Sequence, residues 1–395
     1  MTDARPAAEA RMMADGRGGT LPRWMAAPSP ALAFALAAAV HAGYALLTGA
    51  AFGGDSEGYS QAADRLIASG FDYAGVVGQT QSTYPAAMYV LFATVVALLK
   101  LVFGGAWAAA LVGLNVLAAA GTAALAVSVA RRATDSALAA WGALALFTAS
   151  FPVTRWTPFI LSDTTFLFLA FLVFAAAADR VLHRDKGWAP VFALAAVAAF
   201  YRPTGAVLLP AAAWALYLAR SRPGRGRRIV TGLVAGAGVA GVLVFSWIMQ
   251  RPARWPLGAL TGTVERTARF YRVGEVVSGR EPTFHAPPST VADYAAITAD
   301  RFIHFFAVGA SDFSLAHTLV NAAFFVPAYL LAAWLFVAML RGRDGLTQPR
   351  RDVFLAAAGF VLATAAFHAL LQVDFDWRYR LPVLPHLMVL AAGGI

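Results

Sequence analysis

Two polar motifs place carboxylates beside apolar runs. The first, GDSEGYS, holds Asp55, Glu57 and Tyr59 directly after the first long apolar segment. Asp55 and Tyr59 are four positions apart, so they share one face if this segment is helical. A carboxylate at the mouth of a membrane cavity can accept a proton from a hydroxyl, which makes Asp55 a candidate general base. A helix N-cap explains the same residues, and the sequence leaves both interpretations open.

The second carboxylate motif is SFPVTRWTPFILSDTTF, in which Asp163 lies a few residues inside an apolar run. An aspartate at the centre of a membrane helix costs about 2.5–3.5 kcal/mol on insertion scales, so such residues are usually functional or paired. Near the end of the helix the cost falls, and an N-cap formed by Ser162 or Asp163 explains the motif equally well.

Arginines follow apolar runs at two places where no cytoplasmic loop accounts for them. Arg202 lies in YRPTG, and Arg378 and Arg380 lie in DFDWRYRLPVLPH. A guanidinium group binds phosphate through two hydrogen bonds, so these residues suit a phosphate-ester ligand. Arg202 could instead extend to the membrane surface, and Asp374 or Asp376 could pair with the later arginines.

The composition indicates what must position these side chains. Of 395 residues, 59% are hydrophobic and only 13% are charged, whereas soluble domains carry about 25% charged residues. Runs long enough to cross a ~30 Å hydrocarbon layer are frequent, and alternating strand patterns are absent. The sequence therefore predicts an all-α polytopic membrane protein. The net charge of +10 lies in short loops rather than in a basic groove, which argues against nucleic-acid binding.

Loop charge predicts the topology. Short segments rich in arginine and lysine are typical of cytoplasmic loops. We therefore expect a disordered cytoplasmic tail at 1–28 and one transmembrane domain at 29–395, with external loops at about 52–84 and 250–300. The first external loop should contain a short interfacial helix. Apolar segments lie at 31–51, 85–104, 106–130, 136–154, 159–181, 188–201, 204–219, 229–249, 318–340, 353–372 and 381–395.

These segments conflict with the loop charges at one point. Two apolar segments separate the external loop 52–84 from the cytoplasmic pair Arg131 and Arg132, where only one crossing is permitted. We expect the segment 85–104, which contains Lys100, to be re-entrant or interfacial. About ten spans then remain, in a bacterial inner membrane with a cytoplasmic N-terminus.

Other polar residues within apolar runs are expected to have packing roles. His41 and His368 lie in alanine-rich helices and should pack or line a cavity rather than bind a ligand. Asn115 should form a hydrogen bond to a neighbouring helix.

The order of the motifs resembles the GT-C membrane glycosyltransferases, and in particular their protein-mannosyltransferase and aminoarabinose-transferase-like group (glycosyltransferase family 39-like). The likeness covers roughly 30–395. Family members often have a double proline where this chain has Pro85-Ala86, and many have glutamate in place of Asp163. Some have two adjacent acidic residues in the first external loop, where Ser56 separates Asp55 from Glu57 in this chain. The matching elements are Asp55-x3-Tyr59, Tyr84-Pro85, Asp163, Arg202-Pro203, and Arg378-Tyr379 with Pro382 and Pro385.

The resemblance implies an inverting sugar transfer from a polyprenyl-phosphate donor to a glycan, lipid or protein acceptor on the non-cytoplasmic face. Asp55 would be the catalytic base. No cofactor is certain, but a divalent metal ion is possible, with Asp163 and Glu57 as candidate ligands. A transporter or flippase for a lipid-linked or anionic solute is the alternative, because it also needs charges and broken helices inside the membrane. The expected donor-binding residues are Tyr59, Tyr84, Asp163, Arg202, Arg378, Tyr379 and Arg380.

Overall fold

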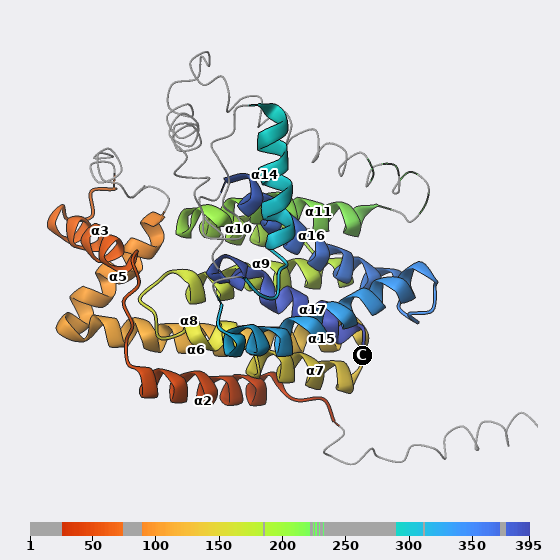
Figure 1. The fold of residues 1–395 in the computed structure, drawn as a ribbon, viewed down its shortest axis with the longest axis horizontal. Coiled ribbons are helices and arrows are strands. Elements are labelled where there is room, and N and C mark those ends of the chain that lie inside the picture. Colours follow the sequence, from red (N-terminus) through yellow and green to blue (C-terminus); the bar gives the residue numbers. More distant parts are fainter. Residues whose placement is uncertain are drawn as a thin grey trace, which may run out of the picture.

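A computed structural model describes most of the chain as helices joined by short turns (Figure 1). Within the described part, no strand is present, and extended pairing is limited to one isolated bridge. The described residues are 26–73, 89–184, 186–221, 224, 226, 229, 232, 290–310, 313–371 and 377–395. The predicted tail and external loop 250–300 fall largely outside these ranges, as do Tyr84, Asp374 and Asp376.

Five helical segments among the described residues are long and apolar enough to cross a membrane. This finding agrees with the predicted all-α membrane protein, whereas the count of about ten spans and the GT-C fold remain predictions. The second segment consists of α5 (Val90–Phe103), a 3₁₀ turn (Gly104–Ala106) and α6 (Trp107–Thr134). The other four are α2 (Pro30–Thr48), α9 (Asp163–Leu182), α15 (Leu315–Leu340) and α16 (Gln348–Leu371).

Shorter helices complete the bundle. Most helices lie along the long axis of the molecule, whereas α14 stands across it (Figure 1). Residues 384–392 of α17 are all buried, so this short helix lies inside the bundle, where it packs on α6, α7, α15 and α16. The shorter elements are α3 (Ser56–Ala68), α7 (Ala137–Thr148), α8 (Phe151–Trp156), α10 (Ala189–Tyr201), η4 (Pro203–Val207), α11 (Leu208–Arg220), α14 (Val291–His304), η6 (Trp377–Val383) and α17 (Leu384–Gly393).

Helix α5 packs against the short helix α3, and the re-entrant or interfacial position expected for the segment 85–104 stays a prediction. The 14 residues of α5 span about 21 Å at 1.5 Å per residue, less than the hydrocarbon thickness. Lys100 on α5 forms an ion pair with Asp64 on α3, with 2.7 Å between Nζ and Oδ1. It also donates hydrogen bonds to the hydroxyl and carbonyl of Ser60. These contacts hold α3 against α5.

Basic segments that are far apart in the sequence meet at one end of the bundle. Arg132 at the end of α6 pairs with Asp179 near the end of α9, with 2.9 Å between Nη1 and Oδ1. Arg350 at the start of α16 reaches Asp135, which follows α6. The basic segments around Arg132, Asp179 and Arg350 therefore share one end of the bundle, which we call the basic end.

Candidate functional site

The opposite end holds the candidate site, which begins with a backbone link between two distant loops. The amide of Ala51 donates to the carbonyl of Pro158, and the amide of Ile160 donates back to the carbonyl of Ala51. This parallel bridge joins the segment after α2 to the turn before α9. It therefore places the start of α3, with Asp55, beside the start of α9, with Asp163.

Two side chains hold this link in place. The Ser56 hydroxyl accepts from the amide of Gly53 and donates to the carbonyl of Ile160, both at 2.8 Å. The Asn115 amide on α6 donates to the carbonyls of Thr157 and Phe159, both at 3.0 Å. Asn115 was expected to bond a neighbouring helix, but it bonds the turn between α8 and α9 instead. Three separate elements are thus tied together by buried polar groups.

Asp55 and Arg378 form the first ion pair of the site. Asp55 is the N-cap residue of α3, yet its side chain makes no capping hydrogen bond. Its Oδ2 lies 2.7 Å from Nη1 of Arg378 on η6, and the two side chains are 28% and 18% exposed. The Asp55 side chain is therefore held by an ion pair rather than by a capping bond, and both side chains are partly exposed.

Asp163 and Arg202 form the second ion pair, and it is more deeply enclosed. Oδ1 of Asp163 lies 2.5 Å from Nη1 of Arg202, and the side chains are only 3% and 6% exposed. Asp163 begins α9 after the N-cap Ser162, which makes no side-chain capping bond. Arg202 also lies 5.9 Å from the ring centroid of Phe166. The arginine therefore does not extend to the membrane surface.

The position of Arg202 depends on a sharp break after α10. The following residue is Pro203, which starts the 3₁₀ helix η4 and fits there because the first turn of a helix needs no amide donor. The η4 backbone then passes very close to α10: a Cβ on Gly205 would lie 1.9 Å from the carbonyl oxygen of Ala198. Only glycine fits, and the break turns Arg202 toward Asp163.

Tyrosines connect the two ion pairs. Tyr59 is buried beside Tyr89, with ring centroids 5.2 Å apart, and the two side chains are hydrogen-bonded. Tyr89 lies within electrostatic reach of Asp55, Asp163 and Arg202. The two ion pairs therefore belong to one site. Sequence reasoning missed Tyr89, although it lies five residues after the singled-out Tyr84.

Tyr379 stays next to Arg378, whose Cζ lies 5.4 Å from the centroid of its ring, whereas Arg380 has different surroundings. The ring of Tyr379 stacks on His368 of α16, at 5.0 Å and 17°. Arg380 is buried, donates to the carbonyl of Ala307, and lies 4.6 Å from the ring centroid of Phe325. The structure thus places Tyr379 beside the site and gives Arg380 partners elsewhere in the bundle.

The expected metal ligands do not converge among the residues described. Glu57 is exposed and accepts a hydrogen bond from Gln61, while Asp163 is engaged by Arg202. No group of three or more acidic or histidine side chains in the described ranges could hold a metal ion. Tyr84, which was predicted to bind the donor rather than a metal, lies outside these ranges.

No protein-family model, no curated protein and no solved structure matches this chain. The chemical evidence is therefore the site itself: two carboxylate–arginine pairs and two tyrosines, at the end opposite the basic end. The outer pair is partly exposed and the inner pair is buried. Such an arrangement can bind an anionic group and accept a proton beside it.

Proposed function

We propose that the protein is a membrane glycosyltransferase that moves a sugar from a polyprenyl-phosphate donor to an acceptor hydroxyl or amine on the non-cytoplasmic face. The observation that carries the proposal is the partly exposed Asp55–Arg378 pair beside the buried Asp163–Arg202 pair. It supplies a proton acceptor and a phosphate-binding cation side by side. The apolar helices account for a lipid-linked donor, and the GT-C resemblance supports the same reaction class.

The two arginines have different tasks in this proposal. Arg378 is the more accessible of the two, so its guanidinium binds the donor phosphate directly and stabilises the charge that develops on it. Arg202 is neutralised by Asp163 and buried. It therefore fixes the start of α9 beside the phosphate site rather than binding the phosphate itself.

Asp55 is the general base. When the donor phosphate binds Arg378, it replaces the Asp55 carboxylate as the partner of the guanidinium. Asp55 is then free to accept the proton of the acceptor. The acceptor oxygen or nitrogen then attacks the anomeric carbon from the side opposite the phosphate. The bond from that carbon to the phosphate oxygen breaks, and polyprenyl phosphate leaves with the electron pair. The sugar is transferred with inversion.

The test uses purified protein in lipid nanodiscs, a panel of radiolabelled polyprenyl-phosphate sugars and envelope acceptors. We expect wild type to release polyprenyl phosphate and Asp55→Asn to lose at least 10²-fold in rate while retaining donor binding, as loss of a general base usually causes. Glu57→Gln is the matched control because it removes an exposed carboxylate two residues away. Equal turnover by Asp55→Asn and wild type contradicts the base assignment.

The same purified protein, reconstituted into sealed lipid vesicles in place of nanodiscs, distinguishes the transporter alternative. A transporter or flippase would move the labelled lipid or solute across a sealed vesicle without cleaving the sugar–phosphate bond. Transbilayer movement with an intact donor, abolished by Arg378→Gln, would overturn the proposed transfer reaction.

A further inference from the structure

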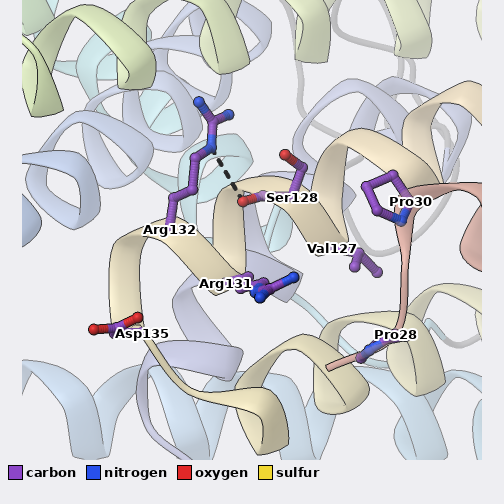
Figure 2. Close-up of a pocket in the computed structure, with 7 residues that line it drawn as sticks. All are labelled: Pro28, Pro30, Val127, Ser128, Arg131, Arg132 and Asp135. Carbon is purple, nitrogen blue, oxygen red and sulfur yellow. Dashed lines mark hydrogen bonds between the residues drawn. The ribbon is translucent and has the colours of Figure 1, made fainter. Parts of the chain in front are cut away.

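A hollow lined by arginines lies at the basic end of the bundle. Its larger part, about 370 Å³, lies between the ends of α6 and α9 and the start of α16. A smaller part, about 250 Å³, adjoins the chain that leads into α2 and shares Arg132 and Asp135 with the larger one. Figure 2 shows the smaller part, with Arg131 and Arg132 leaving α6 in different directions. The larger volume falls in the range of small-molecule sites.

The hollow has more positive than negative charge. Asp179 alone faces Arg132, Arg180 and Lys186 within 3.6 Å. Asp135 is matched by Arg350, with 3.2 Å between Oδ2 and Nη2. No ion pair is found for Arg131 with any of the residues the structure describes. Cations exceed carboxylates around the hollow, even with its histidine neutral.

The backbone adds to this potential at one side. Helix α16 begins at Gln348, and the hollow is lined by Thr347, Pro349 and Arg350. A helix N-terminus carries partial positive charge and unpaired amide groups, which favour a phosphate. The C-terminal ends of α6 and α9 carry partial negative charge instead, and basic side chains are common near such ends. This accounts for part of the arginine content at α6 and α9. It does not explain cations on α16.

Two residues near the hollow favour the phosphate of a lipid over that of a soluble molecule. Trp141, near the start of α7, is partly exposed and donates a hydrogen bond from Nε1 to the carbonyl of Ala26. Tryptophan that is half in apolar surroundings is typical of the headgroup level of a bilayer. Leu138, one turn earlier, is 63% exposed and offers an apolar surface for an acyl chain. The hollow therefore has a tryptophan and an exposed leucine close by, a combination that suits the headgroup region of a bilayer.

We propose that this hollow binds the phosphate of an anionic phospholipid, with Arg131, Arg132 and Arg350 around the headgroup. The site is distinct from the proposed transferase site, since it lies at the other end of the bundle, and it does not depend on the proposed reaction. Its ligand needs a phosphate with a net negative charge, as in phosphatidylglycerol, whereas a zwitterionic headgroup brings its own cation. Basic pockets between membrane helices bind headgroups in this way.

The test measures lipid binding to the delipidated full-length protein in neutral detergent, by native mass spectrometry and by the shift in Tm. We expect phosphatidylglycerol to bind and raise the Tm, and phosphatidylcholine at the same concentration to do neither. In Arg131→Gln/Arg350→Gln the dissociation constant for phosphatidylglycerol should rise about thirtyfold, as expected for the loss of two cations near a headgroup. Arg343→Gln is the matched control, because it removes an exposed charge from the α15–α16 turn outside the hollow.

Two results would overturn the proposal. Equal binding of phosphatidylglycerol by wild type and the double variant, with both folded as judged by size exclusion, shows that the hollow is not the site. Equal stabilisation by sn-glycerol 3-phosphate shows a site for a soluble phosphate ester rather than for a lipid.

Discussion

The buried ion pair between Asp163 and Arg202 gives the sharpest test of how the site is built. Its side chains are 3% and 6% exposed, with 2.5 Å between the paired atoms. Arg202→Gln leaves the Asp163 carboxylate buried without its cation, and Asp163→Asn leaves the guanidinium in the same state. The double variant replaces both charges by amides. These three variants and wild type form a double-mutant cycle.

The expected magnitudes follow from burial. Removing one partner of a buried pair costs about 3–5 kcal/mol, because the remaining charge is desolvated without compensation. The double variant should lose less than either single variant, because no buried charge is left unpaired. The Lys100–Asp64 pair is the control: Asp64 is 61% exposed, so Asp64→Asn should cost about 1 kcal/mol or less.

The free energy of unfolding is measured in mixed micelles by titration with SDS, with intrinsic tryptophan fluorescence as the signal. Two outcomes would refute the reasoning. One is a loss for Arg202→Gln no larger than for Asp64→Asn. The other is a double variant whose loss equals the sum of the two single losses, which would mean that the charges are not coupled.

Three further predictions concern the scaffold. Asn115→Leu should cost about 1–3 kcal/mol of unfolding free energy, because two carbonyls of the turn 157–159 lose their donor; an unchanged SDS midpoint would contradict this. Gly205→Ala should fail to give a monodisperse peak in fluorescence-detected size exclusion, since its Cβ would overlap a carbonyl of α10, whereas Gly43→Ala meets nothing within 4 Å and should behave as wild type. The chain has no cysteine, so Leu101→Cys can be labelled alone; labelling by an impermeant maleimide exclusively from the cytoplasm would disprove an interfacial α5.

Local sequence patterns predicted the all-α class and the four charged residues of the candidate site, but not Tyr89. Apolar runs predict the positions of the described membrane helices, and charges beside these runs led directly to Asp55, Asp163, Arg202 and Arg378. An apolar run and the charged residue beside it both lie within about twenty residues of sequence. Over such a stretch, hydropathy and the cost of desolvating a charge are enough to make the prediction.

The pairing of those charges could not be predicted in this way. Which arginine meets which aspartate depends on helix packing and on the bridge between Ala51 and Phe159, which no local pattern shows. The two arginines of η6 illustrate the limit. A 3₁₀ helix has three residues per turn, so Arg378 and Arg380 point in different directions although only one residue separates them. Both arginines could bind one phosphate only if their side chains pointed the same way, and in this 3₁₀ helix they do not.

The ion pair across α9 and α10 also bears on how the chain enters the bilayer during synthesis. Helix α9 presented alone carries an unneutralised aspartate, and α10 presented alone carries an unneutralised arginine at its end. Each charge adds to the cost of inserting its own helix. Entry of the two helices together, as a hairpin with Asp163 and Arg202 already in contact, avoids both costs. We therefore expect α9 and α10 to leave the translocon as one unit, so that the inner half of the site forms before the C-terminal helices arrive.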